Sequence, residues 1–558
     1  MIRTTLALAA ATLLTACSAT GDSALDIPDV AMGEISEDTL RDIVRELSSD
    51  EFEGRMPGTI GEEKTVALLI DRFEKAGLQP GNNGSWTQDV PIVTIEGSNF
   101  STLRVGGPAA YLEFEPRKDF VAVSYREVPE ISLEDSEMVF VGYGINAPER
   151  GWNDYEGVDM TGKTAVILVN DPDYETDGLE GNFNGRAMTY YGRWSYKYEE
   201  AARQGAAAAL IVHDEFPAAY GWNVVESSWS GPAGYAQREN KGMDQTLANG
   251  WIQKGVAEAI LTAAGQDLAE LTAAAKQKDF KPVPLGIAAS LSFENSFESL
   301  TTKNVIGVLP GSERPDEYII HTAHWDHLGT CPADDEGDDI CNGAIDNATG
   351  TAALVALAEA HSKAGAPDRS LVFLAVTAEE QGLLGAYHYA TNPVFPLDQT
   401  VGGLNMDALL MGGPAKDVTV VGAGKSELDD FLEAALAQTG LVATPEPTPE
   451  KGFYYRSDHF AFAKRGVPML YIDPGLDLVD GGTEAGIKVQ DAYYAGPYHS
   501  PNDEFDENWD WSGIMGLMDT FYLLGRSLGN STSWPNWVEG DEFRATRDED
   551  CAASEAGC

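Results

Sequence analysis

Two histidines and four acidic residues in the C-terminal half of the chain have the types and positions needed to hold metal ions. They occur in the segments AHWDHLG, AIDN, TAEEQG, NMDAL and YHSPND, and the residues are His324, Asp346, Glu379, Glu380, Asp407 and His499. Imidazole and carboxylate ligands without thiolate suit zinc, with manganese and cobalt as substitutes. The set can hold two divalent ions and leave one carboxylate over as a base.

Three of these positions come at the ends of runs that have the character of buried strands. His324 follows residues 318–323, the glutamate pair follows 370–377, and Asp407 ends the run from 400. In open α/β sheets, ligands bind beyond the carboxyl ends of the strands. A single His-x-Asp motif is weak evidence, but three strand ends that deliver acids or imidazoles to one edge predict a site there.

The elements that must position these residues alternate between strand and helix after residue 299. Strand character is found at 318–323, 370–377, 400–407 and 468–472, and helical spacing of apolar residues at 349–364 and 511–528. Alternation of this kind predicts an α/β fold with a mostly parallel mixed sheet sandwiched by helices. Near the N-terminus, Val66, Leu69, Ile70 and Phe73 are spaced as one face of a further helix.

The chain of 558 residues is too long for one core, and the character of its sequence changes along its length. Between 108 and 292, strand-like runs alternate with loops rich in glycine and aromatic residues, which predicts an inserted β-rich domain. The predicted divisions are a signal peptide at 1–16, a tether at 17–35, the main domain at 36–107 and 293–530, the insertion at 108–292 and an acidic C-terminal tail at 531–558.

The net charge of −52 limits the classes of partner. A surface this acidic repels nucleic acid and anionic lipid headgroups, so neither is expected to bind. No stretch after the N-terminal segment reaches the ~18 apolar residues of a membrane helix. We therefore expect no nucleic-acid partner, and contact with a membrane only through an N-terminal anchor.

The N-terminus has the features of an export signal. Arg3 precedes an apolar run at 6–14, which is too short to span a bilayer. The following Leu14-Thr15-Ala16-Cys17 resembles the bacterial lipobox, and this resemblance implies that Cys17 is lipidated and begins the mature protein. Ser18 resembles the residue found in lipoproteins sent to the outer membrane, facing the periplasm or the cell surface. The alternative is an ordinary cleavable signal.

The other four cysteines form two pairs that are close in sequence, Cys331 with Cys341 and Cys551 with Cys558. An oxidising compartment favours a disulfide bond in each pair. For the first pair, metal ligation is the alternative, because it lies within the segment that is rich in metal-binding residues.

The motifs resemble those of the co-catalytic di-zinc exopeptidases, which include bacterial leucyl-type aminopeptidases and glutamate carboxypeptidase. They occur in the family's order, as HWD at 324–326, DN at 346–347, EEQG at 379–382, NMD at 405–407, RSDH at 456–459 and HS at 499–500. With EGRMPGTIGEE near Arg55, the resemblance covers roughly residues 45–105 and 300–528. On looser motifs, VGYGINAPE among them, the insertion resembles a protease-associated domain.

The resemblance divides five ligands between two divalent ions, most simply Zn²⁺. His324 and Asp407 hold one ion, Glu380 and His499 hold the other, and Asp346 bridges both. Two ligands per ion and one bridging carboxylate leave each ion an open position, as catalytic zinc requires.

The resemblance also implies roles for residues that hold no metal. Glu379 is the general base, and Asp326 fixes the ring of His324 by a hydrogen bond. Tyr455, or Tyr454 beside it, is the expected donor to the oxyanion. His327 is expected to lie around the site rather than to bind an ion.

The resemblance implies a metallo-exopeptidase that acts on peptides, and we expect an aminopeptidase that removes N-terminal residues. Three alternatives remain open: a carboxypeptidase or dipeptidase of the same family, a glutaminyl-cyclase-like transferase with one metal, and an inactive receptor-like binding protein. The complete ligand set favours hydrolysis over the last two.

Overall fold

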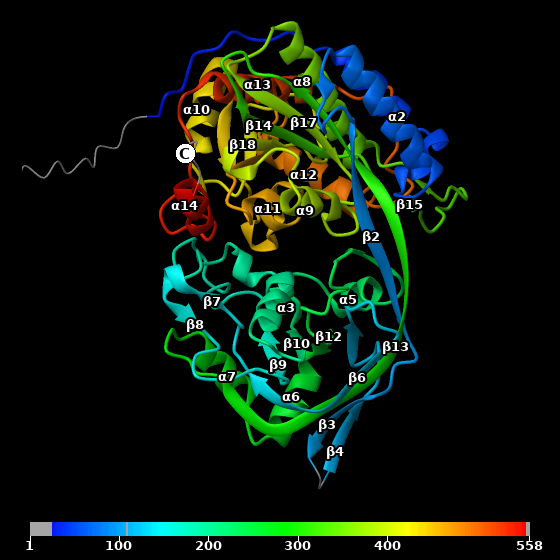
Figure 1. Ribbon diagram of the computed structural model, residues 1–558, viewed down its shortest axis with the longest axis vertical. Coiled ribbons are helices and arrows are strands. Elements are labelled where there is room, and N and C mark those ends of the chain that lie inside the picture. Colours follow the sequence, from blue (N-terminus) through cyan, green and yellow to red (C-terminus); the bar gives the residue numbers. More distant parts are fainter. Residues whose placement is uncertain (1–24, 108–109, 554–558) are drawn as a thin grey trace, which may run out of the picture.

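The computed structural model describes residues 25–107 and 110–553, which form two lobes (Figure 1). The first, here called the main lobe, contains α1 (Glu37–Leu47), α2 (Ile60–Lys75) and the chain from β14 (Arg314–His324) onward. The second lobe lies below it in the figure and is built from the chain between these parts. The long strand β13 (Val283–Leu309) runs through both.

The main lobe has a mixed sheet whose central strands are parallel. Starting from β13, the order is β17 (Arg369–Val376), β14, β18 (Thr400–Asn405), β21 (Met469–Pro474), β19 (Asp417–Val421) and β20 (Val442–Pro445). The four strands from β17 to β21 run parallel, whereas β13 pairs antiparallel with β17, and β19 pairs antiparallel with β21 but parallel with β20. The predicted α/β class with a mostly parallel mixed sheet is confirmed.

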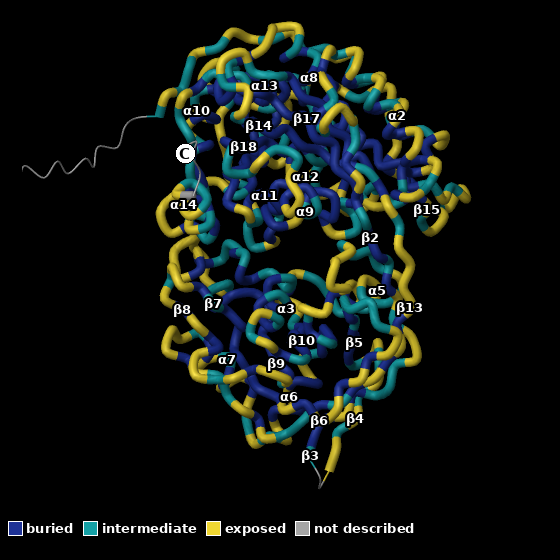
Figure 2. Tube along the Cα trace, in the orientation of Figure 1, coloured by how far each residue is buried: buried dark blue, intermediate teal, exposed yellow. Residues whose placement is uncertain are grey.

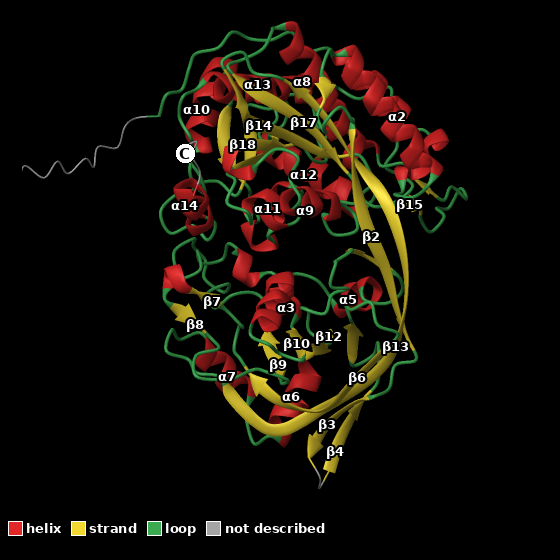
Figure 3. Ribbon diagram, viewed as in Figure 1, coloured by secondary structure: helices red, strands yellow, loops and turns green. Residues whose placement is uncertain are grey.

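Helices cover both faces of this sheet (Figure 3). One face packs against α1, α2, α8 (Gly350–Lys363), α10 (Leu428–Thr439) and α13 (Ser512–Asn530), and the other against α9 (Leu384–Thr391) and α11 (His459–Ala463). Successive residues of a strand point to opposite faces, so Ile319 and Phe373 lie in the first core while Ile320 and Val372 lie in the second. Burial on both faces explains the nearly continuous apolar strands.

The second lobe has its own cores and a sheet in the order β6 (Glu130–Phe140), β9 (Thr164–Leu168), β10 (Ala208–His213), β12 (Ala248–Gln253) and β5 (Phe120–Val123). Its helices α3 (Trp194–Arg203) and α6 (Lys254–Ala263) cover opposite faces, so the lobe is less purely β than predicted. It also begins before the predicted boundary at 108, because Leu103 and Val105 of β3 (Leu103–Gly107) lie in its core.

A two-stranded ribbon joins the lobes. The strand β2 (Thr87–Ser98) pairs antiparallel with β13 from Thr87 opposite Val305 to Ser98 opposite Glu294. The ribbon extends from the main sheet into the second lobe without a break (Figure 1). The insertion is therefore connected to the main lobe by hydrogen-bonded strands and not by flexible loops.

Both predicted terminal segments pack against the main lobe. Residues 25–35, predicted as part of a tether, place Ile27 and Val30 against the main core, so the prediction is wrong for this part. The predicted acidic tail is likewise an ordered element that ends in α14 (Arg544–Ala553), and it buries Trp537 and Phe543. A few large apolar residues are enough to anchor each segment, although neither has a clear periodic pattern.

Other expectations concern the surface and the termini. Figure 2 shows buried residues along the strands and exposed residues on the outer loops and helices. A disulfide bond joins Cys331 to Cys341 at the base of the acidic loop. Within the described ranges, no helix is long and apolar enough to cross a membrane. The predicted signal peptide at 1–16, the lipidation site Cys17 and the partner cysteine Cys558 lie outside the described residues.

Candidate metal centre

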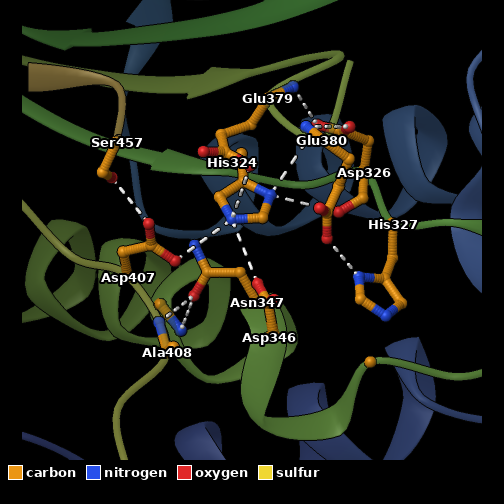
Figure 4. A network of polar contacts seen from close by, with 12 residues as sticks. His324, Asp326, His327, Asp346, Asn347, Glu379, Glu380, Asp407, Ala408 and Ser457 are labelled. Carbon is orange, nitrogen blue, oxygen red and sulfur yellow. Dashed lines mark hydrogen bonds and ion pairs between the residues drawn. The ribbon is translucent and has the colours of Figure 1, made fainter. Parts of the chain in front are cut away.

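Four of the six candidate site residues lie at the carboxyl ends of three adjacent parallel strands, and Figure 4 shows their side chains turned toward one another. His324 is the last residue of β14, which lies between β17 and β18. The glutamates Glu379 and Glu380 follow β17 after a short turn, and Asp407 follows β18. The structure thus brings the strand-end residues together at the edge where the sequence predicts them.

Asp346 comes from a different element, the turn that leads into α8. Its backbone N–H and that of Ile345 donate to the two carboxylate oxygens of Asp503, each at 3.0 Å. The hydroxyl of Tyr493 donates to the same carboxylate at 3.1 Å. Asn347 fixes the other side of the turn, because its side chain bonds to the carbonyl of Met406. The turn is therefore held from two directions, and the Asp346 side chain points toward the ligands (Figure 4).

The distances divide the centre into two halves that share Asp346. In the first half, His324 Nε2 lies 3.1 Å from Asp407 Oδ1 and 3.3 Å from Asp346 Oδ1. In the second half, His499 Nε2 lies 3.1 Å from Glu380 Oε2 and 3.3 Å from Asp346 Oδ2. Each oxygen of Asp346 thus faces a different imidazole, which is the arrangement a bridging carboxylate needs.

The donor atoms in this centre fit divalent cations. Five carboxylates meet here, those of Asp326, Asp346, Glu379, Glu380 and Asp407, and their ion pairs are all with histidines. In the part of the chain that the structure describes, no lysine or arginine forms an ion pair with any of them. Buried carboxylates require compensating charge, and cations bound among them would supply it.

The tautomer of His324 also fits metal binding. Its Nδ1 lies 3.2 Å from the backbone carbonyl oxygen of Asp326, a group that can only accept a hydrogen bond. The proton therefore belongs on Nδ1, and the lone pair of Nε2 faces the carboxylates of Asp346 and Asp407. A carbonyl behind the ring is a common way to orient a metal-binding histidine.

This geometry corrects the role predicted for Asp326. Its carboxylate lies 3.8 Å from His324 Nδ1, too far for the predicted hydrogen bond. Instead its two oxygens accept from the backbone N–H groups of Glu379 and Glu380, at 3.1 and 3.4 Å. The side chain therefore fixes the turn that carries the two glutamates, and the carbonyl of the same residue fixes the histidine. Sequence spacing cannot separate these two functions of one residue.

The two adjacent glutamates have opposite electrostatic environments. Burial raises the pKa of Glu379 well above its usual value, and the charges of Asp407 and Glu380 add to the effect. Burial acts in the same direction on Glu380, but His327 and His499 outweigh it and lower the pKa to about 2. Glu380 is thus held as a carboxylate, the form that a metal ligand needs, whereas the surroundings of Glu379 favour its protonated form.

Arg55 is a fully buried residue for which the sequence analysis predicts no separate role. Its guanidinium donates to the carbonyls of Leu47, Trp325, Asn342 and Gly343 at 2.6–2.9 Å. It therefore ties the N-terminal segment to the loop after His324 and to the loop before Asp346. The segment EGRMPGTIGEE, part of the family resemblance, contains Arg55 and could have indicated that this residue has a role.

The structure does not support Tyr455 as the donor to the oxyanion. Its hydroxyl donates to Glu542 Oε1 at 2.8 Å, on the C-terminal segment that was predicted to be a weakly patterned tail. The ring of Tyr454 packs on His459, with 4.5 Å between the ring centroids, and its hydroxyl makes no hydrogen bond within the described residues. Neither hydroxyl contacts a candidate ligand.

Tyr498 is a tyrosine that contacts a candidate ligand. Its ring stacks on His499 with the centroids 3.8 Å apart. Burial raises the pKa of its hydroxyl, and the charges of Asp346 and Glu380 add to this effect, so the group stays protonated and can donate. Its position next to a ligand histidine in the sequence was a signal that could have identified it.

The second lobe contacts the loops around this centre. A Cβ atom added at Gly234 would lie 2.3 Å from the side chain of Gln381, which directly follows the glutamate pair. Ion pairs between Glu199 and Lys464 at 2.8 Å and between Arg186 and Glu450 at 2.7 Å hold the two lobes together. The second lobe therefore packs against the loop that follows the glutamate pair and is joined to the main lobe by ion pairs.

Residues 304–523 match the family described as Peptidase family M28. An aminopeptidase of Mus musculus is 31% identical over 247 residues, covering 40% of this chain and 30% of that protein. Leucine aminopeptidase 2 of Arthroderma otae is 26% identical over 259 residues, covering 44% of this chain and 47% of that protein. A probable zinc metalloprotease of Pyrenophora teres is 43% identical over 88 residues, which is 15% of this chain and 18% of its own length.

Among solved structures, this chain is similar to an aminopeptidase from Aneurinibacillus sp. strain AM-1. The match covers 88% of this chain and 93% of that protein, with 20% sequence identity and a TM-score of 0.44. The matches to the first curated relatives span only 18–30% of those proteins.

Proposed function

We propose that this chain, whose residues 304–523 are a domain of peptidase family M28, is a zinc-dependent aminopeptidase that removes N-terminal residues from peptides. One observation carries the proposal. Asp346 presents one carboxylate oxygen to His324 and the other to His499, so the ligands form two halves around one shared residue. Similarity to aminopeptidases and to a zinc metalloprotease supports the same conclusion.

Each half of the centre would hold one zinc ion. His324 and Asp407 would bind the first and Glu380 and His499 the second, with Asp346 between them. Zinc ions held by these residues would lower the pKa of a bound water molecule and polarise the carbonyl of the scissile peptide bond.

The side chains around the ligands perform the proton transfers. Glu379 accepts the proton of the attacking water and transfers it to the leaving amine. Asp326 keeps this glutamate in place by accepting from its backbone N–H. The hydroxyl of Tyr498 donates to the oxygen of the scissile carbonyl as negative charge develops on it. The second lobe, which we propose to be a protease-associated domain, limits access to peptide ends.

A panel of blocked peptides tests this function. Peptides with a free N-terminal amine, N-acetylated peptides and C-terminally amidated peptides are incubated with the purified protein, with and without a chelator. We expect cleavage of free-amine and amidated peptides, no cleavage of acetylated ones, and no activity after chelation, which restored zinc reverses. Cleavage of acetylated but not amidated peptides would identify a carboxypeptidase, and cyclisation of N-terminal glutamine would identify the transferase.

We also propose that the protein is exported and anchored by lipid at Cys17, on the basis of the lipobox-like residues 14–17. The Cys17→Ser variant should leave the membrane fraction or accumulate as an unprocessed precursor, because no thiol remains to be acylated. Fractionation and intact mass measure this, with Ser18→Ala as the control that keeps the cysteine. Unchanged processing and unchanged membrane association of Cys17→Ser would show that the anchor lies elsewhere.

A further inference from the structure

His327 is a fully buried histidine beside the second half of the centre, and the proposed mechanism gives it no role. It lies on the loop after β14, three residues beyond His324. Its Nδ1 lies 2.6 Å from Glu380 Oε1, and Figure 4 shows the ring directed at that carboxylate. The contact is a charge-assisted hydrogen bond between two buried groups, which makes it one of the stronger interactions in the site.

The two oxygens of Glu380 have separate partners. Oε1 faces His327, whereas Oε2 lies 3.1 Å from His499 Nε2 on the side of Asp346. An ionised carboxylate can only accept, so the proton of the hydrogen bond belongs on His327 Nδ1. Oε2 is then the oxygen of Glu380 that remains available to the second ion.

The surroundings of His327 hold its ring in this orientation. A Cβ atom added at Gly343 would lie 2.5 Å from His327 Cδ2, so the backbone packs directly against the ring. The same Gly343 carbonyl accepts from the buried guanidinium of Arg55, which also binds the carbonyl of Trp325 on the histidine's own loop. The ring is therefore fixed by packing and by buried hydrogen bonds on both of its neighbouring loops.

We propose that His327 is a positioning residue that makes Glu380 bind the second ion through one oxygen only. This inference rests on the proposed two-metal function. By holding Oε1, the imidazole prevents the carboxylate from binding through both oxygens, and one position on the ion stays open for water or substrate.

The competing role for His327 is direct ligation. Each of His327, Asp346 and Glu380 offers one ligand atom, and these three atoms lie within 4.8 Å of one another. A metal ion bound among them is therefore geometrically feasible. However, His499 already brings an imidazole to the available oxygen Oε2 and to Asp346, while His327 faces the opposite oxygen. The geometry therefore favours the hydrogen-bonding role.

Three substitutions separate these roles. Asn places its amide nitrogen near the position of Nδ1, Gln places it near Nε2, and Leu has no donor. We expect His327→Asn to keep the affinity for both ions, and His327→Gln and His327→Leu to weaken the second ion about 10–100-fold while the first is unchanged. Zinc is titrated against a chromophoric chelator, and cobalt replaces it for visible absorption spectra that report the ligand atoms.

The control is His361→Asn, which alters another fully buried histidine of the main lobe, one whose ring stacks on Tyr522. Equal zinc affinity in wild type, His327→Gln and His327→Leu would overturn the proposal. The proposal would also be overturned if His327→Asn bound the second ion as weakly as His327→Gln and its cobalt spectrum showed the loss of an imidazole ligand. The ring of His327 would then be a ligand. If Leu does not fold, the comparison of Asn with Gln decides.

These titrations need no turnover. A wild-type protein that binds two ions without cleaving peptides would refute the proposed activity. The zinc titrations of the His327 variants would still test the role of His327. A wild type that binds fewer than two ions would refute the two-metal proposal itself.

Discussion

The Glu379→Gln variant is expected to keep both metal ions and to lose about 10²–10⁴-fold in kcat. Gln has the size of Glu and can still form hydrogen bonds, but it cannot accept a proton at neutral pH. The residue is not needed as a ligand in the proposed arrangement, because Glu379 Oε2 lies 3.9 Å from His324 Nε2 while Asp346 and Asp407 lie closer. Steady-state kinetics and elemental analysis of the same preparation measure the two properties.

The matched variant is Glu380→Gln at the next position. It should lower the occupancy of one metal position, because a neutral amide replaces the carboxylate that faces His499. Both variants will have low activity, so the metal content distinguishes them. If Glu379→Gln lost an ion while Glu380→Gln kept two, the two roles would be reversed. Near-normal kcat in Glu379→Gln with both ions bound would exclude it as the base.

The Asp346→Asn variant should lose metal from both positions at once, with activity below detection. The wild type should hold close to two equivalents of zinc, because its ligands form two halves, and this residue contributes an oxygen to each. Equilibrium dialysis followed by elemental analysis measures the content. Asp335→Asn, an equal charge change on the exposed acidic loop, is the control.

Loss of only one ion from Asp346→Asn would mean that this carboxylate does not bridge. A wild type that saturates at one equivalent would contradict the two-metal proposal and favour the glutaminyl-cyclase alternative.

The strand-end ligands could be predicted from the sequence because the rule behind them is simple. Residues that follow buried parallel strands must meet at one edge of the sheet, whatever the rest of the fold does. His324, Glu379, Glu380 and Asp407 follow this rule, and the fold class follows from the same alternation of strands and helices. Asp346 and His499 lie on turns, and only the family resemblance indicated their roles.

The tyrosine was misassigned because its hydrogen bond depends on a contact between distant parts of the chain. Tyr455 donates to Glu542, whose carboxylate also lies 3.1 Å from Lys425 Nζ. Nothing in the local sequence of the C-terminal segment predicts that its glutamate returns to the core. Arg55 was unassigned for the same reason, since all four of its acceptors are backbone carbonyls, which have no signature in a sequence.

The ribbon of β2 and β13 has a consequence for the order in which the protein is assembled during synthesis. The helices α1 and α2 pack against α8, which the ribosome makes only after the whole second lobe. Until then the apolar face of α1, with Leu40, Ile43, Val44 and Leu47, lacks α8, the helix that it packs against. Contacts between distant parts of a chain form slowly, and exposed apolar surface promotes aggregation in the meantime. The second lobe, whose strands are contiguous, can fold first, and Val305–Leu309 of β13 then lacks its partner strand until β17 is made.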